Sequence, residues 1–260
     1  MSATRTYILV LVVTILLATQ AYAANVYVFS GTNATTDAAA VAVLQSYGHN
    51  VTMGMDWRLY DGTLSLAGYD SVYLQMNAYW STDLPAGGQT ALVDYVSNGG
   101  GLVTSEWALW MRGGGALVTL SSVFPLDPTT SYDYIGSMTF TQLTSDPILN
   151  AGLPATFTCP LNSFAGTRTI IPAGLLKAGA TGYYTDGVSY YNLVGWTYGS
   201  GRVLMFSTTN GPDQVNDPEF GRLLSNSMDW TSRTVIPEPS GIMVLASCVL
   251  GMVGFIRKRK

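Results

Sequence analysis

Short apolar runs alternate with amphipathic stretches through the first half of the chain. The runs that we interpret as strands are rich in β-branched or aromatic residues and cover residues 25–30, 50–55, 71–75 and 101–105. A helix is predicted between Thr36, which can cap it, and Gly48, which ends it, and a second helix is predicted over residues 87–97. This alternation indicates a parallel sheet with helices on both of its faces.

The pattern changes after position 132, where Thr-, Tyr- and Gly-rich runs predict antiparallel strands. These runs cover residues 136–143, 169–177 and 189–198. A turn at residues 199–201 leads to a strand over residues 202–207. A helix over residues 218–230, capped by Asp217, closes the body. We therefore expect a three-layer α/β fold with a mostly parallel, flavodoxin-like sheet, helices on both faces, and an antiparallel β-rich insertion in the C-terminal half.

The first 23 residues have the pattern of a secretory signal peptide. Arg5 is the only charge before an apolar run over residues 7–18, and the small residues Ala21 and Ala23 define a cleavage site after Ala23. An apolar run of about 12 residues is too short to span a hydrocarbon core about 30 Å thick. We therefore predict export of the chain and removal of residues 1–23. The alternative is that this segment remains as an N-terminal anchor.

The C-terminal end combines a Pro-rich motif, an apolar segment and a basic tail. Pro237, Glu238 and Pro239 precede a predicted transmembrane helix over residues 241–256, and Lys and Arg residues alone make up the tail at 257–260. A helix of this length covers about 24 Å, and snorkelling of the basic side chains can make up part of the remaining thickness. The positive-inside rule places the basic tail in the cytoplasm. The body is then expected on the outer side of the membrane.

These three C-terminal features resemble the PEP-CTERM protein-sorting signal. The resemblance implies recognition by an exosortase in the inner membrane of a Gram-negative bacterium, cleavage near the Pro-Glu-Pro motif, and delivery to the cell surface or extracellular matrix. A permanent tail anchor is the alternative. The expected organisation is a signal peptide over residues 1–23, an α/β domain over residues 24–233, and a sorting signal over residues 234–260.

Composition and charge exclude several classes of protein. Hydrophobic residues make up 48% of the chain and charged residues 11%, so there is enough apolar surface to stabilise a folded domain. Residues 24–236 contain 7 Lys or Arg and 15 Asp or Glu, a net charge of −8. Nucleic acid is therefore excluded as a partner, because binding phosphates requires clustered basic residues. Cys159 is the one cysteine of the exported body, since Cys248 lies in the C-terminal apolar segment, and no intrachain disulfide is expected there.

Four segments spread over the body are similar to segments of one fold family. They cover residues 92–103, 146–154, 198–206 and 222–230. They resemble the class I glutamine-amidotransferase-like fold, in particular its branch related to trehalose-utilisation proteins. The resemblance implies that a reactive residue would lie at the turn between a central strand and its helix, where amidotransferases have a Cys that acts with a later His and acid. Because the matching segments are mostly scaffold, they support a fold more than an activity.

The chain lacks the reactive groups that this fold family would place at that turn. The turn contains Ser105 and Glu106, and it contains no Cys. Cys159 lies elsewhere and is predicted to be a small buried thiol. The single histidine, His49, is predicted at the edge of the sheet opposite to the edge where ligands bind in open α/β sheets. Since a serine nucleophile needs a base and a zinc site needs several nitrogen or sulfur ligands, we expect no catalysis, no metal and no cofactor.

The carboxyl ends of four predicted strands are expected to meet at one edge of the sheet and to form a candidate binding rim. The rim residues are polar, charged or aromatic: Asn77, Trp80, Ser105, Glu106, Trp107, Asn210 and Asp213. Aromatic faces beside carboxylates and amides suit sugar rings, which have apolar C–H faces and hydroxyl edges. In the alternative interpretation, the tryptophans only fill gaps under the loops.

The sequence thus predicts a non-catalytic protein of the cell surface or extracellular matrix that binds or structures exopolysaccharide. Its expected partners are an exosortase, the inner membrane for a limited time, and exopolysaccharide. One alternative is a carbohydrate hydrolase that uses Glu106 with Asp213 or Asp56 as the second carboxylate. Another is a purely structural component of a biofilm.

Overall fold

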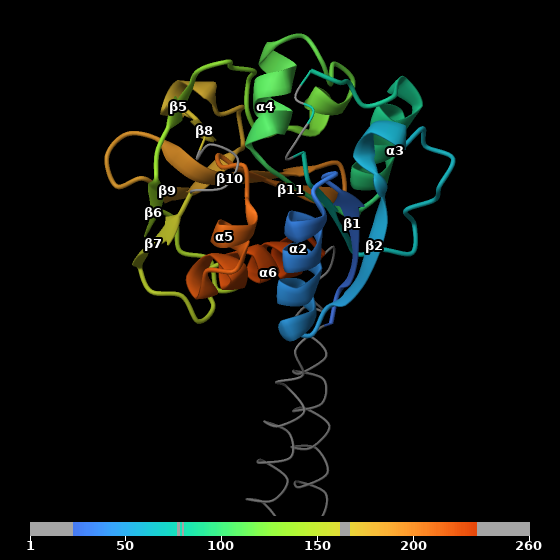
Figure 1. Ribbon diagram of the computed structural model, residues 1–260. Helices are drawn as coiled ribbons and strands as arrows, with labels where there is room; N and C mark the ends of the chain where they lie inside the picture. Colours follow the sequence, from blue (N-terminus) through green and yellow to red (C-terminus); the bar gives the residue numbers. More distant parts are fainter. Residues whose placement is uncertain (1–22, 77–78, 80, 162–166, 233–260) are drawn as a thin grey trace, which may run out of the picture.

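A computed structural model describes residues 23–76, 79, 81–161 and 167–232, and this part of the chain forms a nine-stranded sheet between two layers of helices (Figure 1). The predicted signal peptide and the predicted sorting signal, including the helix over residues 241–256, lie outside the described residues. Within the described ranges, every helix is too short or too polar to cross a bilayer.

Five parallel strands form one half of the sheet. They are β1 (Asn25–Ser30), β2 (Asn50–Asp56), β3 (Ser71–Leu74), β4 (Gly101–Thr104) and β11 (Gly201–Phe206). β1 pairs with β2 and β3, and β4 lies between β3 and β11. All five strands run in the same direction, so the sheet has an amino edge, where they begin, and a carboxyl edge, where they end.

Four further strands extend the sheet in antiparallel pairs. They are β10 (Tyr191–Tyr198), β9 (Thr181–Thr185), β6 (Ser137–Gln142) and β7 (Thr156–Pro160). The full order is β2-β1-β3-β4-β11-β10-β9-β6-β7. The predicted α/β fold with a mostly parallel sheet and an antiparallel insertion is therefore confirmed.

A separate two-stranded ribbon lies beside the carboxyl edge. It consists of β5 (Tyr132–Tyr134) and β8 (Thr167–Thr169), and the Thr169 N–H donates to the Ser207 carbonyl over 2.8 Å. The strand predicted over residues 169–177 is wrong, because β8 ends at Thr169 and a 3-10 helix occupies Ala173–Leu175. Pro172 lies between these elements, and a proline has no N–H for a sheet ladder.

Two helical layers cover the sheet, as Figure 1 shows. One layer contains α2 (Ala34–Ser46), α5 (Pro212–Val215) and α6 (Pro218–Ser232), and the other contains α3 (Ala86–Ser97) and α4 (Glu106–Gly113). Side chains alternate between the two layers along each parallel strand. Val103 and Leu204 pack toward α2 and α6, whereas Leu102 and Val203 pack toward α3, and all four are fully buried. This burial on both faces explains why the inner parallel strands β1, β3, β4 and β11 are continuous apolar runs, whereas the edge strand β2 is exposed or half-buried along its length.

The helix caps agree only in part with the sequence prediction. Asn33, not Thr36, caps α2: its side-chain oxygen accepts from the N–H groups of Thr35 and Thr36, each over 3.1 Å. Asn33 has the extended backbone of a cap residue, with φ −118° and ψ 105°, whereas Thr36 already lies inside the helix. The predicted Asp217 cap is confirmed by its bond to the Phe220 N–H over 3.0 Å.

Candidate functional site

Three loops at the carboxyl edge contain residues in left-handed backbone conformations. Thr32 follows β1, Tyr79 follows β3 and Asn210 follows β11, with φ values of 66°, 60° and 54°. Only four non-glycine residues have positive φ in the described part of the chain, and the fourth is Leu117. Such conformations are unfavourable for these residue types and persist where the surrounding structure fixes them. Three of these four positions therefore lie in loops at the carboxyl edge.

Asp37 holds the loop that follows β1. Its carboxylate accepts hydrogen bonds from the Ser30 hydroxyl over 2.6 Å, the Gly31 N–H over 2.9 Å and the Gln75 side-chain amide over 3.4 Å. Asp37 is 9% exposed, and it joins the ends of β1 and β3 to the first turn of α2. The sequence alone does not indicate this role, because Gln75 lies 38 positions away and only the fold brings it to Asp37.

Asn210 belongs to a second buried polar network. Its side-chain amide donates to the Tyr73 hydroxyl over 3.0 Å, and its oxygen accepts from the Thr208 hydroxyl over 2.7 Å. Gln214 on α5 donates in turn to Thr208 over 2.9 Å. Burial raises the pKa of Tyr73, and the bond from Asn210 opposes this only in part, so Tyr73 stays neutral. The predicted rim residue Asn210 is thus held rigidly at the carboxyl edge.

Several hydroxyl groups at the same edge have no partner among the described residues. They belong to Ser105, at the end of β4, and to Ser207 and Thr209, after β11, and all three residues are fully buried. Ser105 precedes α4 without capping it through its side chain. All three hydroxyls therefore lie beneath the surface of this edge and do not face solvent.

The predicted rim residues fall on different parts of this edge. Ser105 and Asn210 follow neighbouring strands, so the fold brings their segments together. Trp107 packs on the α3 side, with its ring centroid 5.7 Å from that of Trp110, whereas Asp213 belongs to α5 on the opposite side of the sheet. Asn77 and Trp80 lie outside the described residues, and Glu106 begins α4 but its side chain is not described.

An exposed tyrosine, Tyr79, extends the rim over β2. Its partner, Arg58, was not predicted from the sequence. The Tyr79 side chain is 50% exposed, and the guanidinium carbon of Arg58 lies 3.7 Å from the centre of its ring. Arg58 is fixed in turn by Asp56 through three contacts of 2.6 to 3.1 Å. Partial burial acts to raise the pKa of Asp56, but the hydrogen bonds from Arg58 outweigh it and lower the pKa. We call Asp56, Arg58 and Tyr79 the Arg-Tyr platform.

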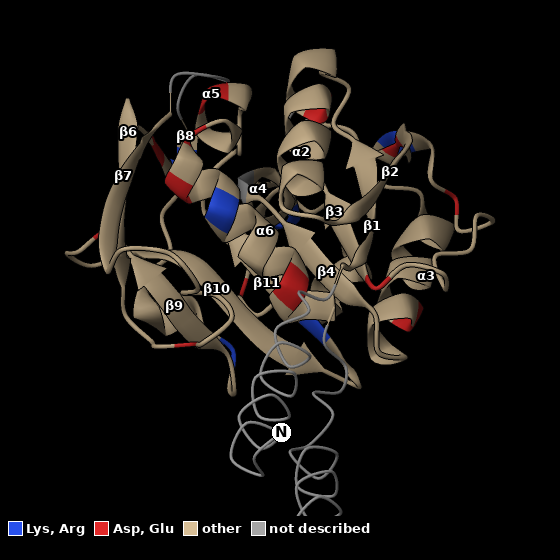
Figure 2. Ribbon diagram, turned by 90° about the horizontal axis from the view of Figure 1, so that it is seen from below, with Lys and Arg blue, Asp and Glu red and all other residues tan. Residues whose placement is uncertain are grey.

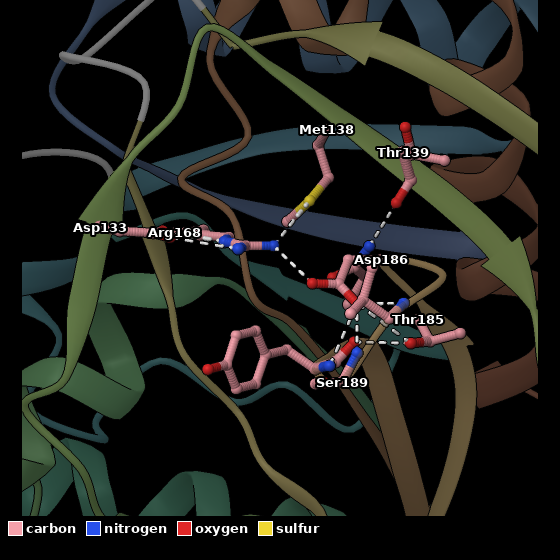
Figure 3. Close-up of polar contacts among 10 residues, drawn as sticks. Asp133, Met138, Thr139, Arg168, Thr185, Asp186 and Ser189 are labelled. Carbon is pink, nitrogen blue, oxygen red and sulfur yellow. Dashed lines mark hydrogen bonds and ion pairs between the residues drawn. The ribbon is translucent and has the colours of Figure 1, made fainter.

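Arg168 fixes the ribbon that borders the rim, as Figure 3 shows. It makes two bonds to the Asp133 carboxylate, of 2.8 and 3.1 Å, and one to Asp186 over 3.2 Å. Its side chain is 12% exposed, and its backbone forms a bridge with Thr208. Because the two acids lie 35 residues before and 18 residues after Arg168, no local sequence pattern indicates this cluster.

The reactive side chains that the sequence singled out lie away from Ser105. His49 contacts the Ser225 hydroxyl over 2.8 Å near the start of β2, at the amino edge, and burial lowers the pKa of His49 despite the nearby Asp229. Cys159 is buried in β7, and burial raises the pKa of its thiol. In the described part of the chain, no three His, Cys, Asp or Glu side chains are grouped so as to hold a metal ion.

Two adjoining hollows occur at the amino edge. One has a volume of about 560 Å³ and is lined in part by Tyr69, Asp70, Tyr95 and Ser232. The other has a volume of about 550 Å³ and shares Tyr69 with the first. The Tyr60 and Tyr95 hydroxyls at the first hollow already donate to the carbonyls of Leu64 and Tyr69. Because residues directly before β2 and β3 line these hollows, both lie at the edge opposite to Ser105 and Asn210.

Comparison with known proteins identifies the fold of this chain but no function. No family model and no curated protein sequence matches the chain. A ThuA-like protein from Parabacteroides merdae has a similar structure, with a TM-score of 0.55 at 13% identity over 84% of this chain and 92% of its own. The chain has a ThuA-like fold. This bears out the resemblance to the trehalose-utilisation branch of the amidotransferase-like fold, and at this identity it shows the fold alone.

Two other solved structures are similar to this chain. A cytoplasmic protein from Salmonella typhimurium LT2 has a TM-score of 0.59 at 13% identity, over 75% of this chain and 86% of its own. A β-galactosidase from Bacillus circulans sp. alkalophilus has a TM-score of 0.57 at 13% identity. The similarity covers 80% of this chain and 31% of that enzyme, so this chain corresponds to one part of the longer protein.

Proposed function

We propose that this chain is an exported, non-catalytic protein of the cell surface or extracellular matrix that binds or structures exopolysaccharide. An exosortase would recognise its C-terminal segment after transient anchoring in the inner membrane of a Gram-negative bacterium. The two terminal segments of the sequence support the localisation. One structural observation carries the binding role: the Tyr79 ring, which is 50% exposed and has Arg58 stacked on it, lies at the carboxyl edge beside the predicted rim.

The chemistry of this edge favours an uncharged, hydroxyl-rich ligand. Tyr79 offers a ring to the apolar C–H face of a sugar, while the Arg58 charge on its other face is already balanced by Asp56. The body has a net charge of −8 over residues 24–236, and basic positions are scattered singly over the described ribbon in Figure 2. An acidic polysaccharide would be repelled by such a body, so we assign neutral polysaccharide as the ligand class.

The placement of the reactive groups supports a role without catalysis. Ser105 lies at the carboxyl edge, whereas His49 lies at the amino edge in contact with Ser225. A serine nucleophile needs a base within hydrogen-bond reach. The ion pair with Arg58 lowers the pKa of Asp56, which is opposite to the shift that a general acid needs near neutral pH.

Binding is tested with Tyr79→Ala in affinity electrophoresis through gels that contain dextran, xyloglucan or the acidic polymer alginate. We expect a neutral polymer to retard the wild-type chain and Tyr79→Ala to weaken this binding by about tenfold, the effect of losing one aromatic anchor. Tyr47→Ala is the matched control, because Arg222 also stacks on Tyr47, at 4.9 Å, at the end of α2 on the amino edge. Equal mobility of Tyr79→Ala and wild type in every gel would contradict the assignment.

The hydrolase alternative is tested separately. The purified chain is incubated with a panel of glycosides, amides and esters, and product is compared between wild type, Glu106→Gln and Ser105→Ala. We expect no turnover by any of the three proteins. Turnover by the wild type that disappears in Glu106→Gln would replace the proposed binding role with a carbohydrate hydrolase.

A further inference from the structure

Both ends of the folded body lie at the amino edge of the sheet. The body begins with β1, where the Asn25 N–H donates to the Asp70 carboxylate over 2.8 Å, directly before β3. It ends with α6, where the Thr231 hydroxyl lies 2.8 Å from the Ser71 hydroxyl at the start of β3. The N-terminal and C-terminal segments therefore leave the body from the same side.

The candidate binding rim lies on the opposite side. Ser105, Asn210 and the Arg-Tyr platform all follow the carboxyl ends of parallel strands. Strand β10 spans this separation: Leu193, near its start, pairs with Phe206 at the end of β11, and its last residue, Tyr198, pairs with Gly201 at the start of β11. Its 8 residues correspond to about 27 Å of extended strand.

The segment between the body and the predicted membrane helix is too short to let the body turn over. Residues 233–240 reach at most about 29 Å when fully extended. A body of this size has a radius of gyration of about 17 Å and is about 40 Å across. To bring the carboxyl edge to the bilayer, the segment would have to run from the end of α6 around the outside of a body about 40 Å across, and this path is longer than its reach.

We propose that the tail-anchored form holds the body with its amino edge toward the membrane and presents the carboxyl-edge rim to the matrix. This orientation rests on the tail anchor of the proposed function. It makes the two amino-edge hollows membrane-facing before cleavage, and it leaves the rim free to bind polysaccharide while the chain is still attached. Binding and removal of the tail then need no fixed order.

Energy transfer from a fluorophore on the body to an acceptor lipid tests this orientation. The full chain with Cys248→Ala is reconstituted in vesicles, and a single label is attached through either Ser200→Cys or Val188→Cys. Position 200 lies in the exposed turn between β10 and β11 at the amino edge, and Val188, 86% exposed, lies in the loop between β9 and β10 at the carboxyl edge. The two labels therefore occupy opposite ends of one strand.

We expect stronger transfer from position 200 than from position 188. Cys248→Ala alone is the control and should take no label, because the remaining thiol, Cys159, is buried. If the chain floats with the vesicles but transfer is equal from both positions, or stronger from position 188, the orientation is wrong and the tail anchor still stands. Failure of the chain to float with the vesicles would instead overturn the tail anchor, and the orientation with it.

Discussion

At the residue scale, Asp186 shows how one carboxylate organises a loop of this fold. One of its oxygens accepts from the N–H groups of Val188, Ser189 and Tyr190, and the other accepts from Arg168. Partial burial acts to raise the pKa of Asp186, but the three N–H groups and Arg168 outweigh it and lower the pKa. The folded state therefore stabilises the ionised form of Asp186.

This makes the stability contributed by Asp186 dependent on pH. Because its folded pKa lies below the unfolded value of about 3.9, the contribution is complete above that value and is lost as the pH falls through the lowered folded pKa. We expect Asp186→Asn to reduce the free energy of unfolding by about 1–3 kcal/mol at neutral pH. Urea unfolding at a series of pH values should show this difference shrinking in acid.

Asp94→Asn is the matched control for that experiment. Asp94 is an exposed aspartate on α3, and its replacement should change the free energy of unfolding by no more than about 0.5 kcal/mol. A difference between wild type and Asp186→Asn that stays constant from neutral to strongly acidic pH would contradict the role assigned to the charge.

At the scale of elements, the end of α6 packs directly on the start of β4. A Cβ atom at Gly101 would lie 2.7 Å from the carbonyl carbon of Thr231, so only glycine allows this approach. We expect Gly101→Ala to lower the free energy of unfolding by about 1–3 kcal/mol, as overpacking does in other cores. Thermal and urea unfolding would measure the loss.

Gly68→Ala is the corresponding control, because a Cβ atom at Gly68 would meet no heavy atom within 4 Å. Its effect should stay within about 0.5 kcal/mol. If Gly101→Ala were as stable as Gly68→Ala, the contact between α6 and β4 would not be the tight junction that fixes the C-terminal end of the body.

The elements also show what the sequence could predict. The parallel strands were found because burial on both faces makes them continuous apolar runs, as at Leu102 and Val103. The strands β5, β7 and β9 were not identified, because they mix polar and apolar residues that only the sheet pairs. The prediction of a strand over residues 169–177 was wrong, because Pro172 has no N–H to donate to a sheet ladder and a 3-10 helix follows it.

The candidate site was predictable only where strand ends define it. Ser105 and Asn210 follow apolar strands, so topology alone placed them at one edge. Arg58 and Arg168 escaped prediction, since each acts through a contact that the fold creates: Arg58 with Tyr79 across 21 positions, and Arg168 with Asp133 across 35. A sequence pattern carries no signal for such pairs.

At the scale of the whole molecule, the chain combines an acidic body with terminal segments that contain many of its basic residues. Residues 24–236 have a net charge of −8, whereas the chain as a whole has −4. In the proposed topology, the four basic residues of the predicted tail would hold that end of the chain in the cytoplasm. Cleavage near Pro237, Glu238 and Pro239 would release a domain with the net charge of −8 that residues 24–236 carry.

The most direct test is the intact mass of the protein recovered from the surface and matrix fraction of cells that produce it. Our account predicts a single form that begins at Ala24 and ends near the Pro-Glu-Pro motif, without residues 241–260. A Glu238→Gln chain produced in the same cells should stay in the membrane fraction with its tail attached. Recovery of the wild-type chain inside the cell with both termini intact would contradict the account.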